Sequence, residues 1–283
     1  WGGYLGWDPV ENASLLPWLT GTAFLHSVLA QERRGLLRVW NLSLVCSTFL
    51  LTILGTFITR SGIIASVHAF SEGGIGPWLL WFFSLVLLVV LALIFWRGDR
   101  LRSQGGIDSA LSREGAFLAN NLAFGAFAFV ILLGTIFPLI VEATQNRQIS
   151  VGAPYFEKMS MPIGFVILFL MAIAPVLPWR KAGTELLRDR LEWPAWGGAL
   201  SLVVAVLVGA RGLIPLLGFG FAGFAGMSAI RHLALSIRRN KVRGFVGRSN
   251  GGMIVHLGVV MLSLGLIASS SYVSQSSFTL DPG

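Results

Sequence analysis

Long apolar runs are the feature that most constrains this chain. Most of them reach the roughly 18 to 20 residues that cross a bilayer as a helix. Eight candidate spans follow from them: residues 11–30, 39–59, 77–96, 116–141, 161–179, 193–208, 212–235 and 251–272. A backbone in lipid must satisfy its own hydrogen bonds, so these runs predict helices. The expected fold is all-α, a polytopic transmembrane helical bundle that forms a single membrane-embedded domain over residues 1–283.

The composition excludes several classes of protein. Hydrophobic residues make up 54% and charged residues 12%, whereas a soluble domain carries about 25% charged residues. A cytosolic enzyme, a nucleic-acid binder and a disordered protein are therefore excluded. The one cysteine, Cys46, lies in an apolar run, so no disulfide framework and no dithiol pair is expected. The chain opens at Trp1 without a methionine or a signal peptide, and we interpret it as a segment of a longer membrane protein.

The basic residues predict the orientation in the membrane. If the residues before the first span lie outside, all but four of the 21 lysines and arginines fall in loops on the inside, as the positive-inside rule requires. Both ends of the chain then face outward. The basic stretch at residues 238–248 is interpreted as a topological anchor and not as a nucleic-acid patch. The four exceptions are Arg60, Arg147, Lys158 and Arg211.

Three local patterns give further expectations about the spans. Gly218, Gly220 and Gly223 match G-x-G-x-x-G, but no strand precedes them, so we predict close helix packing and not nucleotide binding. Arg211 and Gly212 predict a very tight turn between the sixth and seventh spans. Residues 142–160 are expected to form an outer loop.

The first outward segment, residues 1–14, begins a helix. Asp8 can cap it, Pro9 suits the first helical position, and Glu11 completes a capping box. This capping role does not exclude a function for Asp8.

The same segment carries three aromatic residues among three glycines, namely Trp1, Tyr4 and Trp7. Two interpretations are open. The aromatics form an interfacial belt, or they offer flat apolar surfaces to a planar macrocycle at the membrane surface.

Two histidines are expected at equal depth inside the membrane. His26 and His256 each lie six to eight residues from a charged residue of the inner surface, which places them roughly 9 to 12 Å into the inner leaflet. Ionisable groups at such depth are functional candidates, and two imidazoles can ligate one haem iron from opposite faces. The alternative is two packed, hydrogen-bonded histidines. His232 is expected to snorkel at the inner interface.

The fourth histidine, His68, lies in the outward loop 61–76. Apolar neighbours in this loop predict a short amphipathic helix on the membrane. His68 is either an inert loop histidine or an axial ligand beside the aromatic segment. Arg60, just before the loop, is either an interfacial arginine or the partner of a haem propionate.

At these residues the sequence resembles a known family. The stretch WGGYLGWDPVENAS at residues 1–14 resembles the WWD haem-handling signature, and its continuation after Asp8 resembles the CcmF branch of that superfamily. Leu5 and Gly6 stand where relatives often carry aromatic residues. Further motifs extend the resemblance along the chain: Pro17-Trp18-Leu19, Leu25-His26-Ser27, Gly55-Thr56-Phe57, Arg60-Ser61-Gly62, Ser66-Val67-His68-Ala69-Phe70 and His256-Leu257-Gly258.

The resemblance implies a cytochrome c haem lyase of the bacterial System I pathway in the cytoplasmic (inner) membrane, with residues 1–14 and His68 in the periplasm. It implies that His26 and His256 hold a b-type haem. His68 matches the second of two periplasmic histidines that ligate the substrate haem, and the first is expected before Trp1. The implied catalytic site comprises Trp1, Trp7, Asp8 and His68, with Arg60 binding haem. A periplasmic domain and a last span are expected after Gly283.

The resemblance also implies a mechanism and partners. Haem arrives on the chaperone CcmE, the internal haem reduces it, and its vinyl groups add to the thiols of C-x-x-C-H in apocytochrome c. The expected partners are CcmE, CcmH- and CcmI-type subunits that handle thiols and present the apocytochrome, apocytochrome c, a quinol as electron donor, and membrane lipid. No nucleic-acid partner is expected.

Three alternatives remain open at this point. An NrfE-type lyase dedicated to nitrite reductase shares the motifs. A haem transport or delivery protein forms no thioether, and its relatives continue differently after the aspartate. A transmembrane cytochrome b explains His26 and His256 but leaves His68 without a role.

Overall fold

The computed structural model describes residues 5–63, 66, 68, 74–103, 105–181, 183–241 and 250–272. Within these ranges it contains eight α-helices, one 3-10 helix and no strand. The all-α expectation is confirmed. The chain divides into two compact units, residues 1–110 with 114–167, and residues 111–113 with 168–283. Each unit is described by itself below, and the single-domain expectation stays a prediction.

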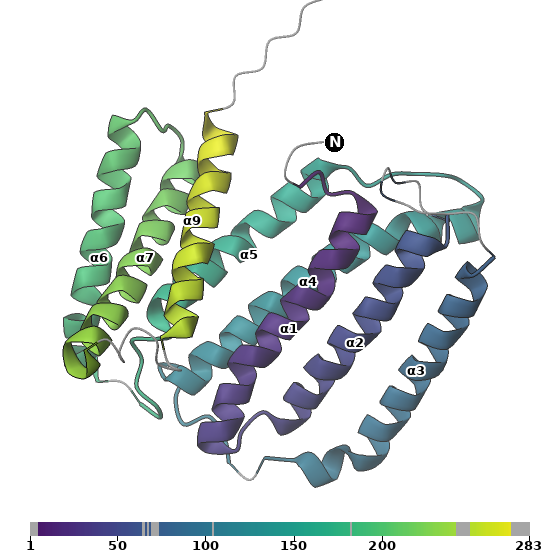
Figure 1. Ribbon diagram of the computed structural model, residues 1–283, viewed down its shortest axis with the longest axis horizontal. Coiled ribbons are helices and arrows are strands. Elements are labelled where there is room, and N and C mark those ends of the chain that lie inside the picture. Colours follow the sequence, from purple (N-terminus) through teal and green to yellow (C-terminus); the bar gives the residue numbers. More distant parts are fainter. Residues whose placement is uncertain are drawn as a thin grey trace, which may run out of the picture. The chain divides into compact units, whose positions relative to one another are not determined.

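Unit 1 begins with three helices side by side (Figure 1): α1 (Pro9–Arg34), α2 (Arg38–Arg60) and α3 (Gly76–Arg97). The 3-10 helix η1 (Gly98–Leu101), α4 (Arg113–Gln145) and the larger part of α5 (Ala153–Ile173) complete it. The turn from α1 to α2 takes three residues, because Gly35 adopts the left-handed conformation (φ 67°) that ends a helix at low cost.

The core of unit 1 lies between α1, α2 and α4. Its buried members are Leu16, Leu19, Ala23, Leu44, Phe124, Ala128 and Ile131. Buried polar side chains also join these helices. In the orientation that satisfies both of its amide atoms, Asn121 of α4 donates to the Ala23 carbonyl (2.9 Å) and accepts from Ser27 Oγ (2.9 Å) and Trp40 Nε1 (3.1 Å). Without water in the bilayer core, such interhelical hydrogen bonds fix how the helices pack.

One end of unit 1 is joined by an ion pair. Arg34, the last residue of α1, lies 2.9 Å from Asp108 and 3.3 Å from the carboxylate of Glu114 in the first turn of α4. Glu114 is only 1% exposed. A buried carboxylate requires a positive partner, so this pair ties the end of α1 to the start of α4.

Unit 2 contains α6 (Thr184–Leu207), α7 (Leu213–Asn240), α9 (Gly251–Ser271) and the last residues of α5. A methyl group added at Gly223 would collide with Ser201, and one at Gly197 would collide with Met227. The predicted close packing of the glycine-rich seventh span is therefore confirmed. The tight turn is confirmed as well, since Gly209 (φ 99°) and Gly212 (φ 90°) connect α6 to α7.

Seven of the described helices are long and apolar enough to cross a membrane, and the multi-pass expectation is confirmed. α6 is not among them, which corrects the sixth predicted span. The apolar stretch in its second half is too short to span a membrane. Its first half carries five charged residues, namely Glu185, Arg188, Asp189, Arg190 and Glu192.

Two boundaries also differ from the expectations. α5 runs from Ala153 to Ile173 instead of 161–179, because Pro175 and Pro178 cannot continue a helix. With α4 reaching Gln145, the outer loop expected at 142–160 shrinks to residues 146–152.

In the loop 61–76, the described residues before α3 are not helical. The amphipathic helix expected there is not found among them, and residues 64, 65, 67 and 69–73 lie outside the described ranges.

Candidate functional site

The start of α1 is held by its own side chains. Asp8 Oδ2 accepts from Val10 N (3.0 Å), while Glu11 Oε2 accepts from Asp8 N (3.3 Å) and Gly6 N (2.8 Å). The predicted capping box is confirmed. Reciprocal capping satisfies donors that would otherwise be unpaired at the helix start, so the backbone around Asp8 is well fixed.

Trp7 precedes this cap in a left-handed conformation (φ 58°) that is uncommon for a bulky residue. Its indole stacks on the ring of Phe156 from the first turn of α5, with centroids 5.2 Å apart and planes at 8°. Asn12 Nδ2 donates to the Trp7 carbonyl and to Thr135 Oγ1, both at 3.2 Å. Buried contacts from α1, α4 and α5 therefore hold the Trp7 backbone and ring in place.

A cavity of about 230 Å³ opens beside Trp7 within unit 1. Its wall combines Trp7 and Phe156 with Thr135 and Pro138 of α4 and with the short loop before α5. This volume exceeds the roughly 150 Å³ that holds a benzene ring. The space next to the indole can therefore accept a ring or the edge of a larger planar group.

His68 lies next to Asp8. Its Nδ1 is 3.5 Å from Asp8 Oδ2. Ser66 Oγ donates to the same Oδ2 at 2.5 Å and accepts from the His68 backbone N–H at 3.0 Å. The structure thus brings together two residues that the sequence placed 60 positions apart.

Arg60 belongs to the same end of unit 1. It ends α2, which is antiparallel to α1: Gly55 packs so closely on Ala13 that an added methyl group would lie 3.3 Å from the Ala13 carbonyl oxygen. The side chain of Arg60 is exposed. Trp1 and Tyr4, also expected in the aromatic segment, lie outside the described residues.

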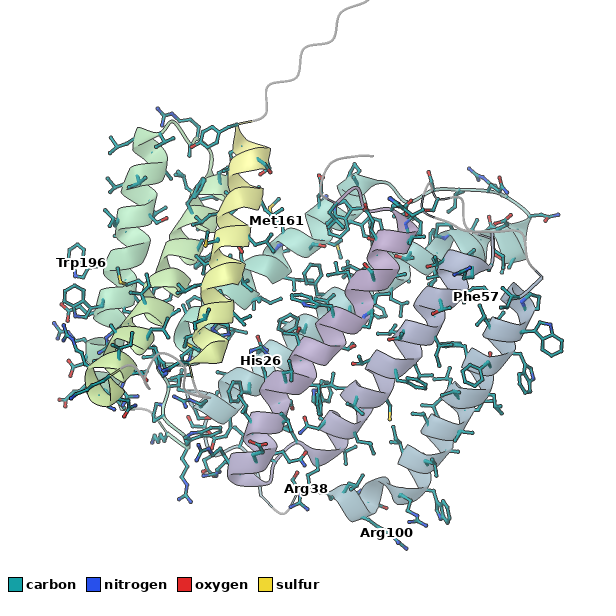
Figure 2. All side chains as sticks on the ribbon, viewed as in Figure 1. His26, Arg38, Phe57, Arg100, Met161 and Trp196 are labelled. Carbon is teal, nitrogen blue, oxygen red and sulfur yellow. The ribbon has the colours of Figure 1, made fainter. Side chains whose placement is uncertain are left out.

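His26 lies far from this end, 18 residues along α1 from Asp8, or about 27 Å at 1.5 Å per residue (Figure 2). Its Nδ1 is 2.9 Å from the Thr22 carbonyl. A carbonyl only accepts, so Nδ1 carries the hydrogen and Nε2 carries the lone pair. The rings of Phe117 and Phe124 flank the imidazole, each with its centroid 6.2 Å away. This is a suitable geometry for a metal ligand in an apolar site.

His256 lies in the second turn of α9 in unit 2 and is partly buried. Among the described residues of that helix only Val260 is fully buried. Most of the described part of α9 is therefore not covered by the other helices of unit 2. His26 and His256 belong to different units, and their pairing across one iron stays a prediction.

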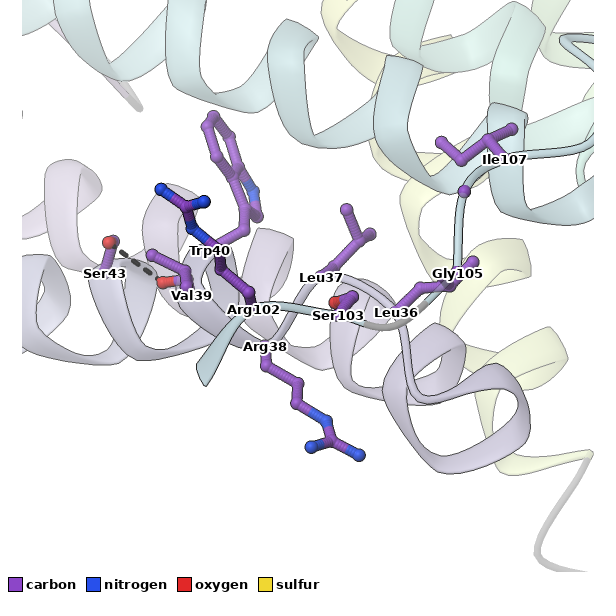
Figure 3. Close-up of a pocket in the computed structure, with 11 residues that line it drawn as sticks. Leu36, Leu37, Arg38, Val39, Trp40, Ser43, Arg102, Ser103, Gly105 and Ile107 are labelled. Atoms are coloured by element: carbon purple, nitrogen blue, oxygen red, sulfur yellow. Dashed lines mark hydrogen bonds between the residues drawn. The ribbon is translucent and has the colours of Figure 1, made fainter. Parts of the chain in front are cut away.

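A second cavity, of about 410 Å³, lies beyond the end of α1, whereas Trp7 precedes the start of that helix; Figure 3 shows the residues that line this cavity. The turn before α2 and the segment after η1 form it, and Arg38, Trp40 and Arg102 are among its lining residues. None of the predicted site residues lines it. It is not part of the candidate site.

Two contributors were not predicted as site residues. Phe156 supports Trp7, and its only sequence signal is an aromatic pair just after an outward loop. Ser66 joins Asp8 to His68; it stands in a motif quoted for the resemblance, but its type gives no sign of that role.

Comparison with known proteins indicates the family of this chain. Residues 1–64 match the family model described as cytochrome C assembly protein. CcmF of Pseudomonas aeruginosa is 35% identical over 290 residues, which cover 100% of this chain and 44% of the relative. A solved structure of cytochrome c heme lyase CcmF has a TM-score of 0.73 at 36% identity, covering 96% of this chain and 41% of that one. The probable cytochrome c-type biogenesis protein NrfE of Escherichia coli is 44% identical over 183 residues, which cover 64% of this chain and 33% of the relative.

The helices able to cross a membrane and the family-model match over residues 1–64 place the chain in the class of cytochrome c assembly proteins. Within that class the chain belongs to the CcmF family of cytochrome c biogenesis proteins. It spans less than half the length of the CcmF relatives that it matches.

Proposed function

We propose that this chain carries the haem-docking part of a cytochrome c haem lyase, which attaches haem to apocytochrome c through thioether bonds. One observation carries the proposal. Trp7 and Asp8, adjacent in sequence, fix an indole and an imidazole at the same end of unit 1. A flat aromatic surface and an iron ligand at the same end of a unit are what a haem needs from its site.

The residues at this end have separate tasks. Trp7 offers the indole face that Phe156 does not cover, and His68 ligates the iron of the substrate haem. Arg60, exposed at the end of α2, pairs with a propionate. Trp1, outside the described residues, is proposed to take part in haem binding, and Asp8 contacts His68.

The chemical step is the addition of a thiol to each haem vinyl group. A sulfur–carbon bond forms at one vinyl carbon and the thiol hydrogen goes to the other, so the addition itself is redox-neutral. Both thiols belong to a C-x-x-C-H motif of the apocytochrome. The protein contributes position and exclusion of competing reactions, whereas the reactive groups belong to haem and substrate.

The buried histidines give the second part of the proposal. His26 and His256 would hold a b-type haem, and this group would supply single electrons to keep the substrate iron reduced. The Thr22 carbonyl supports this assignment, because it holds the hydrogen of His26 on Nδ1 and leaves the Nε2 lone pair for iron. A quinol is the proposed source of these electrons.

Orientation and partners follow from the same proposal. The end that bears Trp7 and His68 faces the periplasm of the bacterial inner membrane, in agreement with the predominance of basic residues in the opposite loops. CcmE delivers the haem, and CcmH- and CcmI-type subunits present the apocytochrome.

An NrfE-type lyase is the second candidate, because NrfE is 44% identical over 183 residues of this chain. The two candidates share the site and differ in the apoprotein served. Cells that lack both lyases and express the full-length protein would distinguish them. Haem on a general c-type cytochrome supports the first candidate, and haem on nitrite reductase alone supports the second.

The central experiment replaces His68 by Ala in the full-length protein. Covalent haem on a reporter cytochrome c is expected to fall below detection, with normal protein in the membrane. Ser14→Ala is the matched control, because Ser14 is exposed in the second turn of α1 and donates only to the Glu11 carbonyl among the described residues. Normal maturation with His68→Ala would refute the proposed role.

A further inference from the structure

A single oxygen atom joins the start of α1 to the His68 loop. Asp8 Oδ2 accepts from the Val10 backbone (3.0 Å) and from Ser66 Oγ (2.5 Å), and it lies 3.5 Å from His68 Nδ1. The Asp8 side chain is 19% exposed and that of His68 31% exposed, so both groups are largely shielded from water. Interactions of a carboxylate strengthen when water is partly excluded.

Ser66 holds the loop by both sides of its hydroxyl group. The hydroxyl donates its hydrogen to Asp8 and accepts the His68 N–H at 3.0 Å. A hydroxyl–carboxylate bond is a short, charge-assisted hydrogen bond, about twice as strong as a neutral one. The backbone of His68 is therefore tied to Asp8 through Ser66, while its ring approaches Asp8 directly.

The carboxylate is itself fixed, because Asp8 is the N-cap of a 26-residue helix. A ligand supported from a rigid helix end keeps its geometry better than one supported from a loop alone. Trp7 is the preceding residue, so the same cap also determines where the indole stands. Asp8 therefore follows the residue that bears the indole and also contacts the His68 loop.

We propose that Asp8 and Ser66 are positioning residues that present Nε2 of His68 to the iron of the substrate haem. Carboxylates next to one imidazole nitrogen commonly orient the ring and raise the basicity of the other nitrogen toward a metal. Ser66 sets the backbone of His68, and Asp8 sets its ring. The proposal rests on the proposed function in one respect, namely that His68 ligates haem.

The test uses full-length protein in nanodiscs and ferric protoporphyrin IX as the probe. Ser66→Ala removes the bridge, and Ser66→Thr keeps a hydroxyl. Asp8→Asn preserves the helix cap, because asparagine caps as well as aspartate, but it removes the carboxylate charge. Ser14→Ala again serves as the control. Thermal unfolding verifies that each variant is folded.

Three measurements separate positioning from mere folding. Absorbance titration gives the dissociation constant of added haem, and electron paramagnetic resonance gives its low-spin fraction. We expect Ser66→Ala and Asp8→Asn to weaken binding about tenfold and to lower the low-spin fraction, in the range typical of second-sphere partners. Ser66→Thr and Ser14→Ala should match the wild type. Hydrogen exchange of the His68 amide should accelerate in Ser66→Ala alone.

His68→Ala provides the reference and distinguishes the two ways of failing. If it weakens haem binding but Ser66→Ala and Asp8→Asn bind as the wild type does, the positioning role is overturned and the proposed function stands. If His68→Ala itself binds haem unchanged, the proposed ligand is wrong and the positioning role is overturned with it.

Discussion

The indole of Trp7 lies flat on the ring of Phe156, with 5.2 Å between centroids and 8° between planes. Phe156 is 1% exposed and comes from α5, about 150 residues further along the chain. One face of the indole is therefore covered by the protein. A planar ligand has to approach the opposite face, which makes the aromatic surface one-sided.

Replacing Phe156 by Leu should therefore weaken haem docking. Leucine fills much of the same space but offers no aromatic face, so the indole loses its stacking partner, worth about 0.5 to 1.5 kcal/mol. We expect a several-fold higher dissociation constant for ferric protoporphyrin IX in an absorbance titration. Phe129→Leu is the control, because Phe129 is 63% exposed on α4. Equal affinity of the Phe156 variant and the control would contradict the supporting role.

Gly134→Ala should disturb the contact between Trp7 and Phe156, because Gly134 lies against the Phe156 ring. A Cβ at Gly134 would lie 2.6 Å from ring atoms of both Phe156 and Tyr155. The rings must shift, at a cost of about 1 to 3 kcal/mol for an overpacked site. Thermal unfolding should show a lower midpoint. Gly125→Ala on the same helix meets nothing within 4 Å, so its midpoint should stay the same or rise. An equal fall of the unfolding midpoint in both variants would show that the loss of stability does not come from the contact of Gly134 with Phe156 and Tyr155.

His26→Ala and His256→Ala should each remove the b-type absorbance in a reduced-minus-oxidised spectrum of the full-length protein. Either substitution leaves the iron with one protein ligand, and a low-spin spectrum requires two strong axial ligands. His232→Ala, in α7, should keep the spectrum of the wild type. Unchanged spectra in the His26 and His256 variants would defeat the bis-histidine proposal.

Arg34→Gln should lower the stability of unit 1. The Glu114 carboxylate, 1% exposed, would lose the guanidinium that lies 3.3 Å away. Breaking a buried ion pair on one side costs roughly 3 kcal/mol or more. Unfolding in detergent should occur at a clearly lower temperature. Arg33→Gln, one residue earlier and exposed, should unfold as the wild type does. An equal fall of the unfolding temperature in both variants would show that the Arg34–Glu114 pair is not the cause.

Local features of the helices were predictable because they depend on neighbours in sequence. The capping box of Asp8 and Glu11 needs only a spacing of three residues, and the spans need only enough apolar length. The charged first half of α6 shows the limit of that argument, since length and polarity have to be judged over the whole helix. The start of α5 was misjudged because Pro154 and the charged pair Glu157 and Lys158 fit a loop as well as a first helical turn.

The sequence by itself determined the membrane class, most of the spans and the cap of the first helix, because hydrophobic length and capping are local properties. It also pointed to Trp7, Asp8, His26 and His68. Only the tertiary structure decided that Phe156 lies behind Trp7 and that Ser66 ties His68 to Asp8. Those contacts join residues separated by tens of positions, and they arise from how helices and loops pack in space, which no local pattern encodes.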